Sequence, residues 1–412
     1  MTTTKELQLV PIDKLIPYIN NARTHSPDQI AKLRASLREF GFINPVIIDK
    51  DYTIIAGHGR CAAAKEEGLT EVPCVLADHL TEAQKKAYII ADNRMAMDAG
   101  WDEDLLRVEI EALEAENFDP LLTGFDEDEL SKLFDDGNDT EDDDFDVEAE
   151  LEQPAFTKPG DVWTLGRHRL VCGDSTNPET FTILMEGKKA NLVITDPPYN
   201  VNYEGSAGKI KNDNMANDAF YNFLLDAFRN TEAVMDGDAS IYVFHADTEG
   251  LNFRRAFADA GFYLSGCCIW KKQSLVLGRS PYQWQHEPVL FGWKKKGKHK
   301  WYAGRKETTV WEYDKPKKNG DHPTMKPIPL LVYPIKNSSL TNSIVLDPFA
   351  GSGSTLIACE QTDRICYTIE LDEKFCDVIV KRYIEQVGST ENVSVERDGS
   401  VLKYEEVQIS DE

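Results

Sequence analysis

The apolar positions of residues 158–391 form short runs that alternate with longer amphipathic stretches. Runs at 191–195 and 239–245 are rich in β-branched or aromatic residues, as expected of strands buried on both faces of a sheet. The stretches 220–235 and 375–387 instead repeat apolar residues at helical spacing. Strand and helix patterns in alternation predict an α/β domain built on a mostly parallel sheet.

Residues 1–125 predict a second, smaller α/β module. A capped helix is expected over 26–41, because Ser-Pro opens an apolar helical stripe that Gly41 ends. Strands at 45–49 and 52–56 read as a hairpin, and 72–76 reads as a further strand. This order of elements is typical of a compact domain that folds separately from the larger one.

The charge of the chain is unevenly distributed. The formal net charge is −26 over 412 residues. Residues 126–157 hold one Lys or Arg against fifteen Asp or Glu, whereas residues 158–403 hold 31 of each. We therefore expect an acidic linker at 126–157 and an acidic tail at 392–412. Leu130, Leu133 and Phe134 could form one short helix in the linker, and the rest should be extended and self-repelling. The linker is either a solubilising spacer, which is favoured, or a mimic of DNA charge.

Composition also bears on where the protein resides. No apolar run approaches the roughly 20 residues that span a bilayer, and no signal peptide is recognisable. We expect a soluble, cytoplasmic protein without a membrane partner. The eight cysteines lack a Cys-x-x-Cys pair and mostly lie in apolar patterns, so we expect reduced core residues and no metal site.

The strand predicted at 191–195 ends in Asp196-Pro197-Pro198-Tyr199. Two prolines cannot continue a sheet, so a rigid turn should project a carboxylate and an aromatic ring from the strand's carboxyl end. The Asp196 carboxylate and Pro197 carbonyl could accept hydrogen bonds from an exocyclic amine on a planar base, while Tyr199 stacks on its ring. The competing interpretation is a plain strand terminator with a rim aromatic.

A second turn follows about 150 residues later. Residues 343–355 predict a strand, a glycine-rich turn and a helix start, with Gly351 and Gly353 allowing close approach of a ligand. The turn lacks the Gly-Lys-Ser/Thr of a Walker loop and the Gly-x-Gly-x-x-Gly of dinucleotide sites. The next strand ends in Glu370, an acid placed to bind ribose hydroxyls.

Together the two turns resemble those of the β group of S-adenosylmethionine-dependent DNA amino-methyltransferases, in which the catalytic motif precedes the cofactor motif. The resemblance covers residues 158–391, with a target-recognition insert at about 272–320. It implies a Rossmann-like, mostly parallel seven-stranded sheet. Asp321-His-Pro-Thr-Met-Lys326-Pro resembles a further cofactor motif, in which Lys326 pairs with the methionine carboxylate. The cofactor contacts that the resemblance implies are Asp174, Lys326, Asp347, Phe349, Gly351, Gly353 and Glu370.

The resemblance implies methyl transfer from S-adenosylmethionine to a base flipped out of double-stranded DNA, with Asp196, Pro197, Pro198 and Tyr199 as the catalytic turn. Asp at the first motif position resembles adenine-N6 enzymes, so we expect adenine, with cytosine N4 as the alternative. Methylation of RNA or protein, or a vestigial methyltransferase behind a DNA-binding module, are the rival interpretations. The sequence leaves open whether the protein forms a homodimer.

A basic cluster lies between the two motifs. Its aromatic interleaving with Trp301 and Trp311 favours phosphate contact and base stacking over a solvated face. The expected DNA-binding residues are Lys294, Lys295, Lys296, Lys298, Lys300 and Arg305.

In the smaller module, Gly57-His58-Gly59-Arg60 should form a turn between a strand and a helix. Such a turn can cradle an anion, with Arg60 as a phosphate ligand; the alternative is a tight turn with a surface arginine. Residues 1–125 resemble the ParB/sulfiredoxin-like domain, whose usual Gly-Glu-Arg-Arg box is replaced here. We therefore expect a nucleotide or DNA ligand at this tetrad, without carrying over nucleotide hydrolysis.

Overall fold

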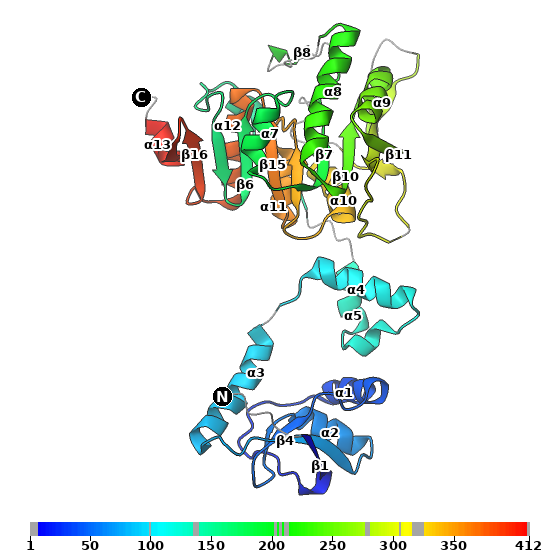
Figure 1. Ribbon diagram of the computed structural model, residues 1–412, viewed down its shortest axis with the longest axis vertical. Helices are drawn as coiled ribbons and strands as arrows, with labels where there is room; N and C mark the ends of the chain where they lie inside the picture. The colour runs from blue at the N-terminus through cyan, green and yellow to red at the C-terminus, as the bar shows by residue number, and fades with distance from the viewer. Residues whose placement is uncertain are drawn as a thin grey trace. The chain divides into compact units, whose positions relative to one another are not determined.

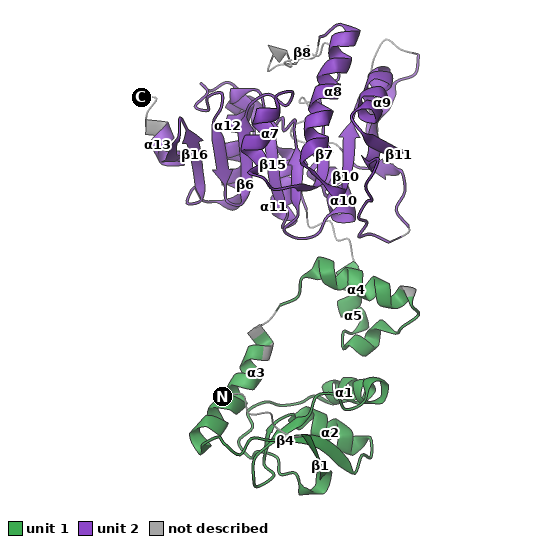
Figure 2. Cartoon of the chain, in the orientation of Figure 1, with its two compact units in different colours: residues 1–137 green, residues 138–412 purple. Residues whose placement is uncertain are grey.

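The computed structural model describes residues 7–98, 100–134, 140–201, 204–205, 208–209, 214–276, 281–304, 306–314 and 325–409. The chain (Figure 1) divides into two compact units, residues 1–137 and residues 138–412 (Figure 2). Each unit has its own sheet and its own hydrophobic core, so each is described by itself.

The first unit is built on a four-stranded sheet. Its strand order is β1 (Leu7–Pro11), β4 (Glu71–Leu76), β2 (Val46–Ile48) and β3 (Ile54–Ala56). The predicted helix is α1 (Pro27–Phe40), which begins with the Ser26 side chain accepting from Gln29 N and ends at Gly41. The remaining helices of this unit are α2 (His58–Glu66), α3 (Glu82–Asp98), α4 (Glu103–Ala115) and α5 (Glu127–Phe134). The small α/β module is thus confirmed.

The second unit is an α/β domain, as predicted. Seven strands form its centre in the order β11 (Phe262–Val276), β12 (Trp284–Lys294), β10 (Met235–Phe244), β7 (Ala190–Thr195), β14 (Ile344–Asp347), β15 (Ile365–Glu370) and β6 (His168–Cys172). Within this set only β12 runs against its neighbours.

Four further strands extend this sheet, so that it has eleven strands among the described residues instead of the seven expected. One edge gains β13 (Val310–Glu312), and the other gains β5 (Val162–Leu165), β16 (Val393–Arg397) and β17 (Ser400–Lys403). The segment expected as an acidic tail, residues 392–412, thus contributes two of these strands. Val393 and Val395 alternate into the core, and this pattern adds the tail to the sheet as a hairpin.

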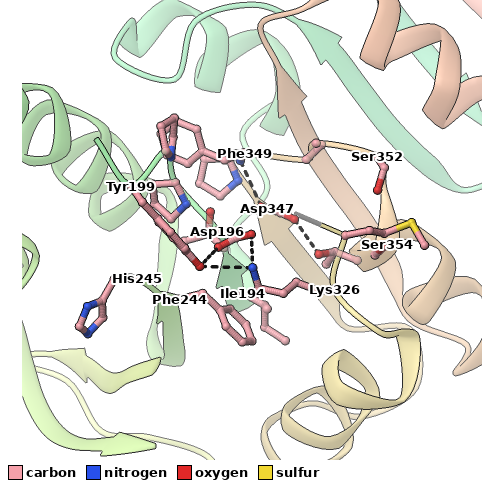
Figure 3. A pocket seen from close by; sticks show the side chains of 18 of the residues that line it. Ile194, Asp196, Tyr199, Phe244, His245, Lys326, Asp347, Phe349, Ser352 and Ser354 are labelled. Carbon is pink, nitrogen blue, oxygen red and sulfur yellow. Dashed lines mark hydrogen bonds and ion pairs between the residues drawn. The ribbon is translucent and has the colours of Figure 1, made fainter. Parts of the chain in front are cut away.

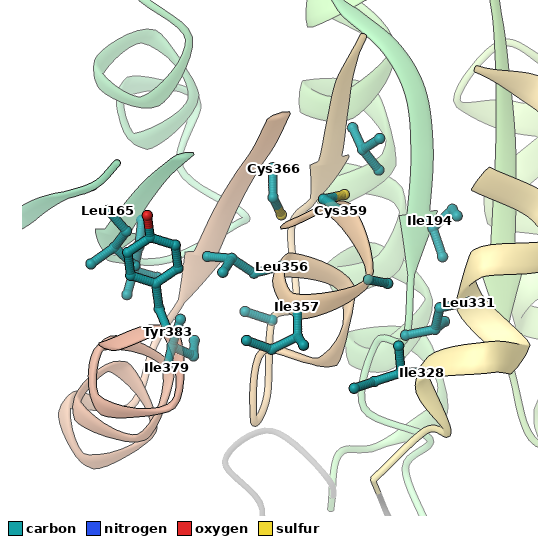
Figure 4. Packing of buried hydrophobic residues seen from close by; sticks show 14 of the residues in the cluster. Leu165, Ile194, Ile328, Leu331, Leu356, Ile357, Cys359, Cys366, Ile379 and Tyr383 are labelled. Atoms are coloured by element: carbon teal, nitrogen blue, oxygen red, sulfur yellow. The ribbon is translucent and has the colours of Figure 1, made fainter. Parts of the chain in front are cut away.

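Helices cover both faces of this sheet. One face carries α7 (Pro178–Met185), α8 (Asn217–Val234) and α9 (Gly250–Asp259), and the other carries α10 (Ile328–Ser338), α11 (Ser354–Gln361) and α12 (Glu373–Val387). Along β7 the side chains alternate: Leu192 and Ile194 pack toward α10 and α11, and Val193 packs toward α8. Figure 4 shows Ile194 next to Ile328 and Leu331 of α10. Each such buried aliphatic side chain contributes about 1.5–3 kcal/mol.

The second half of the predicted acidic linker is also part of this unit. Phe145, Val147 and Leu151, of which the last two bound α6 (Val147–Leu151), are buried against Met325 and Val378. An extended, self-repelling spacer is therefore wrong for residues 141–151. Asp143 and Glu150 pair with Arg382 and Lys381, and Asp142 accepts from Ile328 N. These partners lie more than 180 residues away in the sequence, so a local charge count does not reveal them.

Membrane-spanning helices were not expected. Across the parts of the chain that the structure describes, no helix combines the length and apolarity that crossing a bilayer requires.

Candidate active site

A cavity of about 550 Å³ lies where the parallel strands of the second unit end. Asp196 follows β7, Asp347 ends β14 and Glu370 ends β15, and these three strands are neighbours in the sheet. Carboxyl ends of parallel strands meet at one edge, so all three acids line the same cavity. The proline turn and the glycine turn, which are far apart in the sequence, therefore open into one space.

The proline turn holds its two functional side chains together (Figure 3). The Tyr199 hydroxyl donates to Asp196 Oδ1 at 2.5 Å, and the Lys326 ammonium donates to Asp196 Oδ2 at 2.5 Å. Burial raises the pKa of the Asp196 carboxyl, and the charge of Lys326 opposes that shift. The ammonium thus favours an ionised Asp196 inside the cavity, which is a pure hydrogen-bond acceptor.

Lys326 belongs to a larger buried charge network. It lies 3.2 Å from Glu287 Oε2, and Glu287 Oε1 accepts from Lys272 at 2.5 Å. Burial would raise the pKa of Glu287, but the two ammonium groups outweigh it and hold that pKa at about 2. The sequence analysis assigned Lys326 to a cofactor carboxylate; here its partners are two protein carboxylates.

Lys272 was missed by the sequence analysis. It lies on β11 two residues after Trp270, and its ammonium is 4.8 Å from the Trp270 ring centroid. Residues two apart on a strand share a face, and Trp270 pairs in register with Glu287. In the sequence, the signal that could have identified Lys272 is a lysine two positions after a tryptophan within a strand, because the two side chains then share one face.

The glycine turn is tied to the acid at the end of the next strand. Gly351 N donates to Glu370 Oε2 at 2.8 Å, and Asp372 N donates to Oε1 at 2.9 Å. Gly353 has φ 83° and precedes α11, and a Cβ built there would lie 2.9 Å from Ile379. Only glycine fits that position, whereas Gly351 faces open space.

Two carboxyls border this turn, the buried Asp347 and the half-buried Glu370. Asp347 accepts from Phe349 N at 3.1 Å and from the Thr355 hydroxyl at 2.6 Å. Burial raises the pKa of Asp347 and of Glu370 to about 7 in each case, despite the hydrogen bonds that favour their charged forms. Near neutral pH these groups can therefore accept from hydroxyl and amino groups or donate a proton of their own.

Asp174 also lines the cavity, beyond the end of β6. Its side chain is exposed, and Oδ1 accepts from Thr176 N and from the Thr176 hydroxyl, both at 2.8 Å. Asp174 thus forms a turn with Thr176 and also has the cavity position that the expected cofactor contact requires. Residues 321–324 of the motif that contains Lys326 lie outside the described residues.

The basic cluster lies away from this cavity. Because β12 is antiparallel, its carboxyl end meets the edge where β10 begins, opposite the edge where β7 ends. Lys294 lies 3.5 Å from Glu232, Lys300 lies 3.0 Å from Asp238, and Lys295 donates to the Ala258 carbonyl. Lys296 and Lys298 are exposed. Arg305 lies outside the described residues.

In the first unit, Gly57-His58-Gly59-Arg60 connects β3 to α2, as predicted. The side chains brace neighbouring loops: His58 Nε2 accepts from Tyr18 N at 3.2 Å, and Arg60 donates to the Pro45 carbonyl at 3.2 Å. Burial lowers the pKa of His58, which favours its neutral, accepting form. Arg60 Nε has no hydrogen-bond partner among the described residues.

Comparison with known protein families assigns three segments of the chain. Residues 190–381 match the DNA methylase family of N6 and N4 amino-methyltransferases, and residues 1–93 match the ParB N-terminal domain. Residues 104–159 match the ParB-methyltransferase HTH domain. The helix-turn-helix match was not foreseen, because the sequence analysis interpreted half of this segment as a linker.

Individual relatives agree with these assignments. The ParB-like nuclease domain-containing protein YnaK of Escherichia coli (strain K12) is 45% identical over 85 residues, covering 20% of this chain and 98% of the relative. The type II methyltransferase M.HpaI of Haemophilus parainfluenzae is 24% identical over 231 residues, covering 51% of this chain and 73% of the relative. A crystal structure of the M1.HpyAVI-SAM complex, 23% identical, covers 52% of this chain and 98% of its own with a TM-score of 0.42. By its matches to the family models, the chain joins a ParB N-terminal domain to a DNA methyltransferase domain of the N6/N4 amino-methyltransferase family.

Proposed function

We propose that this protein methylates the exocyclic amino group of a base flipped out of double-stranded DNA, with adenine N6 as the target and S-adenosylmethionine as the methyl donor. One observation carries the proposal. The proline turn with Asp196 and the glycine turn with Gly351 line a single cavity at one sheet edge. Both reactants can therefore be held next to each other, which is the main requirement of direct transfer.

The residues of the cavity fit the proposed cofactor. Gly351 faces open space, the walls include Phe349 and Phe375, and Asp347 and Glu370 can pair with amino or hydroxyl groups. When bound, S-adenosylmethionine supplies an electrophilic methyl group. The residues that would hold it are Asp174, Asp347, Phe349, Gly351 and Glu370, which line the cavity. Gly353, also expected to contact the cofactor, is not among the lining residues and instead allows the turn to pack against Ile379.

On the base side, the ionised Asp196 and the Pro197 carbonyl accept hydrogen bonds from the amine. These bonds draw the nitrogen lone pair out of conjugation with the ring. Pro198 fixes the turn, and Tyr199 presents its ring to the base, with its hydroxyl held by Asp196. Lys326 supports the acceptor role of Asp196 by keeping it ionised, so its partner in this scheme is the protein carboxylate.

The hairpin of β11 and β12 is the part of the expected recognition insert that lies next to the cavity. Trp284 lines the cavity and is partly exposed, and nearby Tyr282 is 90% exposed. Aromatic side chains at such a mouth can stack on unpaired bases. We infer that DNA reaches the cavity past this hairpin, while Lys296 and Lys298 contact phosphates only at the opposite edge of the sheet.

The N-terminal tetrad is proposed to bind a phosphate of a nucleotide or of DNA. The feature that favours this is Arg60 Nε, which has no partner among the described residues, next to the start of α2. Replacing Arg60 with Ala should weaken phosphate-ligand binding by the full chain without unfolding the small sheet. Equal binding by both proteins, measured with labelled nucleotides and duplex DNA, would refute it.

The methylated base is determined directly. DNA from cells that express the protein is digested to nucleosides and separated by mass spectrometry. N6-methyladenine is the expected product. If N4-methylcytosine is found instead, the target of the enzyme is cytosine N4 and not adenine N6. Incorporation of label into RNA or protein but not DNA would overturn the proposal.

A further inference from the structure

The segment 141–151, here called the strap, forms part of the cavity wall. Val147 lines the cavity together with Met325 and Phe375. Phe145, Val147 and Leu151 belong to one buried cluster with Met325 and Val378, and Val147 is only 2% exposed. The strap is therefore integral to the site, although it reads in the sequence as a run of acids.

Helix α12 holds the strap through a series of polar contacts. Lys381 pairs with Glu150 at 2.6 Å, and Lys374 donates to the Leu151 carbonyl at 2.7 Å. Just beyond the strap, Asp377 accepts from the backbone N–H groups of residues 156 and 157 at 2.8 and 3.0 Å. These contacts fix the path of the chain along one face of α12.

One contact links the strap to the glycine turn. Asp143 Oδ2 accepts from Arg382 Nε at 2.6 Å, and Arg382 is 2% exposed. The same guanidinium donates to the Ser352 carbonyl at 2.9 Å and to the Ser354 hydroxyl at 3.1 Å. A buried guanidinium that loses its carboxylate partner is strongly destabilised in place, so Asp143 determines whether Arg382 can hold the turn.

A second contact links the strap to the segment that follows Lys326. Asp142 Oδ1 accepts from Ile328 N, the first residue of α10, at 2.7 Å. A carboxylate on the first N–H groups of a helix stabilises that helix start. The strap therefore contacts both segments that border the cofactor side of the cavity.

We propose that the strap positions the cofactor-binding turn, with Asp143 and Arg382 as a positioning pair. The strap lies within the part of the helix-turn-helix match, residues 104–159, that belongs to the second unit. A displacement of the strap would move both the carboxylate partner of Arg382 and the wall of the cavity. The inference rests on the proposed function, because it takes S-adenosylmethionine as the ligand.

The test compares two variants of the full chain that remove the same charge. Asp143→Asn breaks the pair with Arg382, whereas Glu152→Gln changes an exposed acid just after α6. Calorimetric titration with S-adenosylmethionine should show a dissociation constant about tenfold higher for Asp143→Asn and unchanged for Glu152→Gln. The Michaelis constant for DNA should stay the same in both.

A second readout uses the reciprocity of coupled binding. If the strap positions the cofactor site, S-adenosylmethionine must slow hydrogen exchange of residues 141–151 in the unmodified chain. It should do so much less in Asp143→Asn, whereas a purely structural strap would exchange equally with and without the cofactor.

Val147→Ala provides a third variant without a buried charge, and it decides the matter if Asp143→Asn does not fold. It should raise the dissociation constant about threefold, since a single aliphatic contact is lost. Unchanged binding in every folded strap variant overturns the role of the strap and leaves the proposed function intact. No binding by the unmodified chain overturns both.

Discussion

Two glycine turns, one in each unit, share a local design but differ in what surrounds them. Gly57 precedes α2 with φ 98°, and Gly353 precedes α11 with φ 83°. At the first turn, the side chains of His58 and Arg60 bond to neighbouring backbone. At the second, the half-buried acid Glu370 accepts from the N–H of Gly351, and the turn faces a cavity.

The difference shows that a strand–glycine–helix turn alone does not define a ligand site. What distinguishes the second turn is its neighbourhood. Asp196 directly follows the adjacent strand β7, and Arg382 donates to the Ser352 carbonyl of the turn. The following predictions test whether chemistry is confined to that neighbourhood.

The largest effect is expected from Asp196→Ala. Loss of the acceptor should lower the rate of methyl transfer about 1000-fold or more, while S-adenosylmethionine still binds. Single-turnover assays with labelled cofactor and calorimetry measure the two quantities separately. Turnover close to that of the unmodified protein would move the chemistry away from the proline turn.

Lys326→Met should slow transfer about 100-fold at pH 7, because Asp196 and Glu287 would then lack their shared ammonium. The pKa of Asp196 should rise, so activity should recover as the pH is increased and the carboxyl ionises. Lys272→Met is the matched control, since it leaves the Asp196 ion pair in place. A pH–rate profile with an unmoved acid limb would contradict the role given to Lys326.

The two turns can be compared directly by replacing each glycine with alanine. Gly353→Ala should destabilise the second unit by about 2–3 kcal/mol, since positive φ and contact with Ile379 both oppose a Cβ. Gly57→Ala should cost the first unit only about 1–2 kcal/mol, because its nearest neighbour is the end of the flexible Arg60 side chain. Thermal unfolding of both variants provides the measurement. Equal losses of stability in the two variants would contradict the proposed difference between the two glycine turns.

A further effect concerns the pH dependence of stability. Asp347 has a pKa of about 7 in the folded chain against an ordinary 3.8, so the folded state holds a proton that the unfolded state has released. Stability from this group is therefore present below about pH 4 and is lost as the pH rises toward 7. Asp347→Asn should flatten this slope by up to about 1.4 kcal/mol per pH unit. Asp226→Asn, an exposed change on α8, should leave the slope as it was.

Features with local causes were predictable from the sequence. Apolar runs that end in Asp196 or Asp347 predicted buried parallel strands, and parallel strands bring their carboxyl ends to one edge. The α/β class, the tetrad at a strand-to-helix turn and the meeting of two distant turns followed from these patterns.

Features that depend on distant pairing were not predictable. The antiparallel direction of β12 could be inferred from the sequence, but not its consequence that Lys294 lies at the sheet edge opposite the cavity. Asp143 pairs with Arg382, which lies 239 positions later in the sequence. In the sequence alone, Asp143 is therefore indistinguishable from the other acids of its run. Lys326 was assigned from a motif, but its partner is set by how Asp196 and Glu287 converge in space.

The strap also determines where this chain can be divided. A chimera or truncation made at residue 158, where the charge run ends, would delete Val147 and Asp143. The cavity would then lose part of its wall, and the Arg382 guanidinium would lose its carboxylate partner. A cut before residue 138 keeps that side closed. An exchange of N-terminal domains between enzymes with this domain order must therefore keep the strap together with the methyltransferase domain.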